Sequence, residues 1–179
     1  MKVKPLKLWL LDADVIIDLL SLGVFDNLVK NHQIYICSAV IDEVKHYLED
    51  GYKKSIKFRE EYVVNKIVNE VFALDQDLIL LYQKIPEKFH NAIHDGEIES
   101  LAVLMKNENL NFCTCDGAAI RMILFIDATN RGISVEELLK KTGFSGKKLL
   151  ERHRIKYFKN KIKEGKKEKV YYFNSGNES

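Results

Sequence analysis

The chain has 179 residues, of which 46% are hydrophobic and 30% charged. This balance is that of an ordinary globular protein and excludes a largely disordered or membrane-embedded one. The length suits one compact domain with residues left for an appendage. No apolar run approaches the roughly 20 residues that span a bilayer, and the amino terminus lacks a secretion-signal pattern. We therefore expect a cytoplasmic protein without a membrane partner.

The net charge of +2 is unevenly distributed along the chain. Residues 147–179 carry eleven Lys or Arg against four Asp or Glu, whereas residues 1–146 carry 17 basic against 22 acidic residues. Ile155, Phe158 and Ile162 recur at helical spacing within the basic part. The sequence thus predicts a folded domain over residues 1–141 and a basic, helical C-terminal extension over residues 142–179.

Apolar runs and their spacing predict alternating strands and helices. In chain order we expect a strand over 8–11, helices over 15–20 and 24–29, a strand over 34–37, helices over 40–49 and 55–72, a short strand over 71–73, helices over 78–85 and 97–105, a strand over 111–115, a helix over 118–125, a weak strand or turn over 132–135, a helix over 136–141 and a short edge strand over 171–173. Strands separated by helices need crossover connections. The fold class is therefore α/β, with three layers: a mostly parallel central sheet and helices on both faces.

Carboxylates follow the ends of the predicted strands. In an open α/β sheet, ligands bind at the carboxyl ends of the strands, where consecutive loops meet. Each carboxylate alone also fits a helix cap, a first-turn residue or a turn former. Helix caps need no common edge of the sheet, so the recurrence favours a functional cluster. Its members are Asp12, Glu43, Asp95, Glu97 and Asp116.

Converging carboxylates repel one another strongly. At an effective dielectric constant near 20, two unit charges about 4 Å apart cost roughly 4 kcal/mol. Either some of the acids stay protonated or divalent cations neutralise them, and a set of oxygen ligands without His or Cys favours Mg²⁺ or Mn²⁺. Such ions activate a bound water for in-line attack on phosphorus. The cluster therefore indicates hydrolysis of a phosphate ester.

Four segments, in order and spacing, resemble those of PIN-domain ribonucleases: LLDADVIIDLL, YICSAVIDEV, HDGEIESLAVLM and FCTCDGAAIRM. The resemblance covers roughly residues 6–140. It implies a PIN-like fold and a metal-dependent endoribonuclease that cleaves single-stranded RNA in preference to DNA. It also implies a toxin-type ribonuclease held by an antitoxin-like inhibitor, as in many relatives, or a homodimer.

The resemblance assigns roles to individual residues. It makes Asp12, Glu43, Glu97 and Asp116 the catalytic, metal-binding acids, with Asp95 competing with Glu97 for the third place. Asp14 stands where the family more often has Ser, Thr or Asn, so we expect it to support the loop. Thr114 matches a polar position beside the fourth acid. Metal-bound water would then be the nucleophile, without a protein general base.

Two other functions remain open from the sequence. An apolar run followed by Asp12-x-Asp14 also resembles the first motif of haloacid-dehalogenase-type phosphatases, with Asp12 as nucleophile and Asp14 as general acid and base. That family expects a second Asp near Asp116, and it leaves Glu43 and Glu97 without a role. The third alternative is an inactive PIN-like scaffold.

The extension offers candidate contacts to nucleic acid, since a basic surface attracts a polyanion and its binding is salt-dependent. The alternative is an ordinary solvated helix packed on the domain. The candidate residues are Lys147, Lys148, Arg152, Arg154 and Lys156.

The cysteines are expected to be buried free thiols, because Cys113 and Cys115 are spaced too tightly for a zinc site and have no second Cys/His pair nearby.

Overall fold

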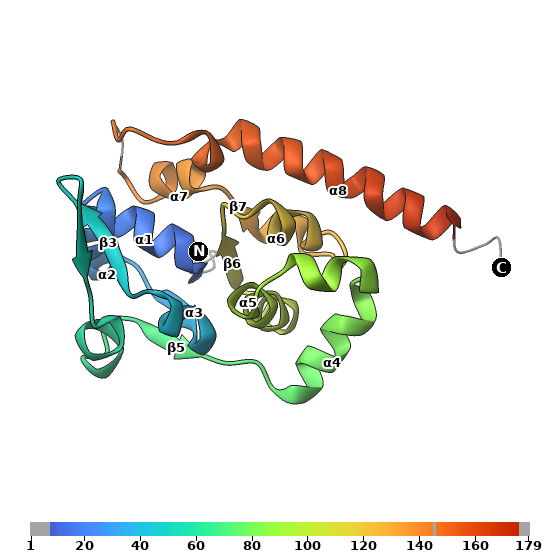
Figure 1. Cartoon of the computed structure of the whole chain (residues 1–179), viewed down its shortest axis with the longest axis horizontal. Coiled ribbons are helices and arrows are strands. Elements are labelled where there is room, and N and C mark those ends of the chain that lie inside the picture. The colour runs from blue at the N-terminus through green and yellow to red at the C-terminus, as the bar shows by residue number, and fades with distance from the viewer. Residues whose placement is uncertain (1–7, 145, 176–179) are drawn as a thin grey trace, which may run out of the picture.

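A computed structural model, which describes residues 8–144 and 146–175, has an α/β fold (Figure 1). Five strands form the central sheet in the order β5-β2-β1-β6-β7, and every neighbouring pair is parallel. The strands are β1 (Leu8–Leu11), β2 (Ile34–Cys37), β5 (Asn69–Val71), β6 (Leu110–Cys113) and β7 (Gly132–Ile133). The expected parallel α/β sheet is confirmed, with small shifts at the ends of some strands.

Helices cover both faces of the sheet (Figure 1). Because crossovers between parallel strands are right-handed, α1 and α2 lie on one face, and α4 and α5, which return the chain in the opposite direction, lie on the other. The helical elements up to the sheet's last strand are α1 (Ala13–Ser21), α2 (Phe25–Asn31), α3 (Ser38–Glu43), the π-helical η1 (Arg59–Val64), α4 (Asp75–Lys84), η2 (Glu87–Ala92), α5 (Asp95–Lys106), α6 (Gly117–Met122) and η3 (Thr129–Arg131).

The core is built from the continuously apolar strands. Leu10, Ile36 and Phe112 of the three central strands are fully buried. Leu19 of α1 and Leu101 of α5 are equally buried. Strands that are apolar on both sides are what a parallel sheet covered on both faces requires.

The segment after α3 differs from the prediction. A helix was expected over 40–49, but α3 ends at Glu43, and β3 (His46–Glu49) pairs antiparallel with β4 (Tyr52–Ser55). Asp50 and Gly51 join these strands with φ angles of 52° and 83°. Asp-Gly is the dipeptide that tight hairpin turns favour, because both positions need positive φ.

The expected helix over 55–72 is also wrong. Its place is taken by the end of β4, the π-helical segment η1 and strand β5. Phe58 and Tyr62 point from this segment onto Phe25 of α2, and the ring of Phe58 stacks on that of Tyr62 at 4.8 Å. Aromatic packing across the sheet face overrides the local helical spacing.

The extension forms α8 (Ile155–Ser175), after α7 (Val135–Lys141) and the short turn η4 (Glu151–His153). The edge strand expected over 171–173 is wrong, because these residues continue α8. The helix runs along α6 on the outside of the domain (Figure 1). Within residues 8–144 and 146–175, no helix is both long enough and apolar enough to cross a membrane.

Candidate metal centre

The carboxyl ends of β1 and β6 lie side by side in the sheet. From β1 the chain proceeds to β2 on one side, and it returns much later to β6 on the other side. This reversal is a topological switch point, where loops diverge and α/β proteins bind ligands. Asp12 follows β1 and Asp116 follows β6. Two of the predicted acids therefore lie at the switch point.

Thr114 links these two acids through its hydroxyl. Thr114 Oγ1 donates to Asp12 Oδ2 at 2.7 Å and accepts from the backbone N–H of Asp116 at 3.1 Å. The other oxygen of Asp12 accepts from Ala13 N at 2.8 Å, and Asp116 Oδ1 accepts from Ala119 N at 2.8 Å. These hydrogen bonds fix the orientation of both carboxylates, and Thr114 lies between the two acids.

Glu97 enters from the first turn of α5 and is buried with 9% exposure. Its Oε2 accepts from the backbone N–H of His94 at 2.6 Å, which closes the start of the helix. Electrostatic interactions connect Glu97 with Asp12, Asp116 and Glu43. Glu97 is therefore the residue that brings the predicted acids into one group.

Glu43 is the last residue of α3 and lies over the backbone of Gly96. A Cβ atom at Gly96 would be 2.8 Å from Glu43 Oε1 and 3.0 Å from Val40 Cγ2. The backbone N–H of Gly96 also donates to the Glu43 carboxylate. Any side chain at position 96 would displace this carboxylate, so glycine is needed for the close approach of α3 and α5.

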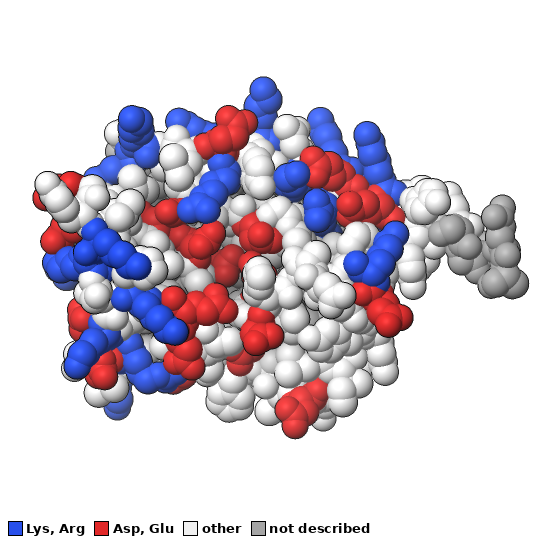
Figure 2. Space-filling model, in the orientation of Figure 1, with Lys and Arg blue, Asp and Glu red and all other residues white. Residues whose placement is uncertain are grey.

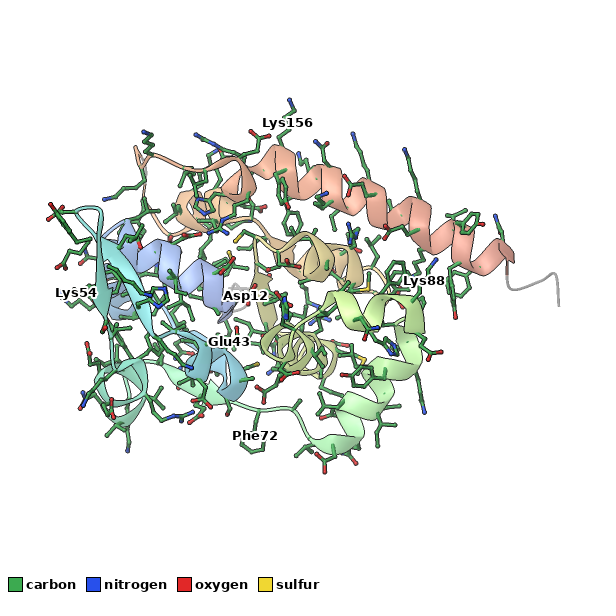
Figure 3. All side chains as sticks on the ribbon, viewed as in Figure 1. Asp12, Glu43, Lys54, Phe72, Lys88 and Lys156 are labelled. Carbon is green, nitrogen blue, oxygen red and sulfur yellow. The ribbon has the colours of Figure 1, made fainter. Side chains whose placement is uncertain are left out.

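We call Asp12, Glu43, Glu97 and Asp116 the carboxylate site. In Figure 3, Asp12 and Glu43 lie near one another at the centre of the view, and Figure 2 shows acidic side chains gathered there. Lys and Arg side chains border this acidic area on the side of α8 (Figure 2). The four acids come from four separate segments of the chain, so only the fold brings them together.

Burial and mutual repulsion change the acidity of the site. Burial away from solvent raises the pKa of Asp12 to about 6, although the hydrogen bond from Thr114 acts in the opposite direction. Burial also raises the pKa of Glu97 to about 8. Neighbouring carboxylates add to both shifts. Partial burial, with Asp95 and Asp14 nearby, also raises the pKa of Glu43. Near neutral pH a bound proton or cation would relieve this repulsion, and carboxylate oxygens are the ligands that Mg²⁺ and Mn²⁺ prefer.

Two predicted residues lie at the edge of the carboxylate site. Asp95 is exposed at the start of α5, whereas Glu97 is buried against Asp12, so the geometry favours Glu97 as the third acid. Asp14 is exposed and forms an ion pair with Arg152 at 3.0 Å. It thereby connects the first turn of α1 to the extension.

The predicted nucleic-acid contacts occupy different environments. Lys147 donates to the carbonyl of Leu22 at 3.1 Å, and Arg154 lies 3.9 Å from Glu136. Lys148 and Lys156 are exposed, and Figure 3 shows Lys156 projecting away from the centre of the domain. Their contact with nucleic acid stays a prediction.

Arg152 and His153 make contacts that the sequence analysis missed. Arg152 Nη2 donates to Asp18 Oδ2 at 2.6 Å, and His153 Nε2 lies 2.7 Å from the same oxygen. Asp18 belongs to α1, which begins next to Asp12, so these pairs fasten the extension to the helix that carries the site. The partners are more than a hundred residues apart, and no local pattern could reveal them.

Asp18, Cys115 and His153 also lie close enough together to hold a metal ion. However, His153 Nδ1 accepts from the backbone N–H of Leu150 at 3.2 Å, which places the ring proton on Nε2, facing Asp18. A metal on Nε2 would need this proton to move to Nδ1, which would break the hydrogen bond from Leu150. Burial also raises the pKa of the Cys115 thiol. This trio is therefore better explained by the hydrogen bond between His153 and Asp18, which holds the extension on α1. The three cysteines are free and buried, as expected.

Comparisons of the chain with models of protein families, with curated proteins and with solved structures found no match.

Proposed function

We propose that the chain is a PIN-like nuclease that hydrolyses phosphodiester bonds of single-stranded RNA with Mg²⁺ or Mn²⁺. The observation that carries this proposal is the convergence of four carboxylates at the switch point of a parallel sheet, with the pKa of Asp12 and of Glu97 raised. Sites with shifted acidity in such a position are characteristic of catalysis. Structural caps alone would not need Glu97 to be buried among other acids.

The role of the chain in this chemistry is to hold oxygen ligands in fixed positions. Thr114 orients Asp12 and the loop of Asp116, and His94 N–H orients Glu97. A bound Mg²⁺ or Mn²⁺ supplies neutralisation of phosphate charge and a lowered pKa of water. Prior orientation of ligands is what makes such a site effective.

The finer parts of the proposal rest on the resemblance to PIN-domain ribonucleases. They are the preference for RNA over DNA, a cytoplasmic toxin-type role, and an antitoxin-like inhibitor or a homodimer. The phosphatase alternative receives less support. Asp14, its general acid and base, is exposed and ion-paired with Arg152, while Glu43 and Glu97 would have no function.

Cleavage of a labelled single-stranded RNA tests the proposal. The wild type should cut RNA with Mn²⁺ and stop when a chelator is added, and Asp116→Asn should lower the rate by at least about a hundredfold, since a ligand is lost. Asp50→Asn is the matched control, because Asp50 is exposed at the tip of the β3–β4 turn and Asn tolerates its positive φ. It should cut like the wild type.

Cutting that persists equally in Asp116→Asn would point to a contaminant and contradict the proposal. Release of phosphate from a small monoester, through a covalent intermediate at Asp12, would favour the phosphatase. If the wild type cuts no RNA, and Glu97→Gln and Asp116→Asn leave its affinity for RNA unchanged, the result would favour a scaffold.

A further inference from the structure

Tyr157 and Lys161 of α8 lie over Gly117, the residue that follows Asp116. A Cβ atom at Gly117 would be 3.1 Å from Tyr157 Oη and 3.2 Å from Lys161 Cε. The two side chains are one helical turn apart, and Lys161 Nζ lies 5.6 Å from the centre of the Tyr157 ring. The extension thus places a hydroxyl and an ammonium group at the rim of the carboxylate site.

The position of Lys161 is set by the packing of α8 on α6. One turn further along α8, Gly165 lies so close to α6 that a Cβ atom there would be 2.6 Å from Leu124 Cδ1 and 3.1 Å from Arg121 Cα. Phe158 is buried on the same helix. These contacts on either side of Lys161 hold the helix beside the carboxylate site.

Lys161 is also oriented and partly withdrawn from solvent. Its side chain is 23% exposed, and its Nζ lies 2.7 Å from Glu164 Oε2. A charge with fewer waters around it interacts more strongly with a neighbouring ion. Glu164 is more exposed than Lys161, at 47%, so the ammonium can exchange this carboxylate for another anion from solvent.

We propose that Lys161, with Tyr157 beside it, forms a phosphate-binding subsite for the RNA strand that enters the carboxylate site. This inference rests on the proposed function. Four carboxylates repel a polyanion, so a substrate phosphate next to Asp116 needs a fixed positive charge. Lysine binds phosphate as a point charge, and the Tyr157 hydroxyl adds a hydrogen-bond donor.

Lys163 is the matched control for Lys161. It carries the same charge on the same helix, two residues further along and hence on nearly the opposite side. It is exposed and lines a different pocket, next to Lys159 and Phe158. General attraction between a basic helix and RNA would depend on both lysines equally, whereas a subsite depends on Lys161 alone.

The test combines RNA binding with RNA cleavage in the full chain. Fluorescence anisotropy measures the affinity for a labelled single-stranded RNA with Ca²⁺ in place of Mg²⁺, and a parallel assay measures cleavage with Mn²⁺. Lys161→Gln should weaken binding by about tenfold, the effect of losing one charged hydrogen bond. Lys163→Gln should change binding by less than about twofold, and Lys161→Arg should retain most of the affinity because it keeps the charge.

The outcomes separate this inference from the proposed function. Equal losses in Lys161→Gln and Lys163→Gln would overturn the subsite, as would cleavage and binding that are unchanged in Lys161→Gln. Specific loss of binding in Lys161→Gln, with a wild type that binds RNA but does not cut it, would support the subsite and reject the nuclease. A wild type that neither binds nor cuts RNA would overturn both.

Discussion

At Thr114, one hydroxyl group serves two parts of the carboxylate site, because it donates to Asp12 and accepts from the N–H of Asp116. Thr114→Val keeps the shape of this fully buried side chain but removes both hydrogen bonds. We expect the free energy of unfolding to fall by about 1–3 kcal/mol, because a buried N–H and a carboxylate oxygen lose their partner. The rate of RNA cleavage should fall at least about tenfold. Denaturant titration and the cleavage assay measure the two effects.

Thr114→Ser is the control for this substitution, since it keeps the hydroxyl and loses only a methyl group. Its cleavage rate should stay near that of the wild type. If Thr114→Val cut RNA as fast as Thr114→Ser, the orientation of Asp12 would not depend on the hydroxyl.

At the scale of elements, the close packing of α8 on α6 depends on Gly165. Gly165→Ala favours an isolated helix by up to about 1 kcal/mol. The added Cβ meets Leu124 Cδ1 and the backbone of Arg121, and crowding of this kind typically costs about 1–3 kcal/mol. We expect a lower melting temperature with unchanged helix content, measured by circular dichroism. Exposed Lys166→Ala, one residue further along, should not lower it, and a Gly165→Ala protein as stable as the wild type would contradict this tight contact.

Elements whose sequence pattern is set by the core could be predicted, and those set by local turns or distant contacts could not. The strands at Leu10, Ile36 and Phe112 were predicted because a sheet covered on both faces needs continuous apolar runs. The hairpin around Asp50 and Gly51 was missed, although its turn dipeptide was visible. The helix expected around Phe58 and Tyr62 is wrong, because the conformation of this segment depends on packing against Phe25, which is distant in the sequence.

Some residues of the candidate site could likewise be predicted from the sequence, and others could not. Asp12 and Asp116 could be predicted, since an acid within a few residues of the end of a buried parallel strand lies at the carboxyl edge of the sheet. Sequence could not choose between Asp95 and Glu97, because both lie in the first turn of a helix, two residues apart, and differ mainly in the direction their side chains face. The contact of Lys161 with Gly117 depends on how α8 crosses α6. The spacing of apolar residues in the sequence does not determine this crossing angle.

For the whole molecule, the carboxylate site makes stability depend on pH. The pKa values of Asp12 and Glu97 in the folded chain, about 6 and about 8, lie above the ordinary values of 3.8 and 4.5. The folded state therefore binds more protons than the unfolded state between these limits. In chelator, the free energy of unfolding should fall as pH rises from about 4 to 8, by up to about 1.4 kcal/mol per pH unit for each group.

Thermal melts in chelator between pH 5 and pH 8.5 measure this dependence. Glu97→Gln removes the group with the larger shift, so its melting temperature should decline less with pH and exceed that of the wild type at pH 8, although the variant should not cut RNA. Mn²⁺ should raise the melting temperature of the wild type most at high pH, where the acids are ionised. A wild type whose stability rises across this range would contradict the shifted pKa values.

The long separation between contacting residues also governs when the site can form during protein synthesis. Thr114 follows its partner Asp12 by 102 residues, and Arg152 follows its partner Asp14 by 138 residues. A growing chain emerges from its amino terminus and folds in that order. The carboxylates cannot converge until β6 has left the ribosome, and α8 covers their rim later still. For the proposed nuclease, this order means that the carboxylate site is still incomplete while most of the chain is being translated.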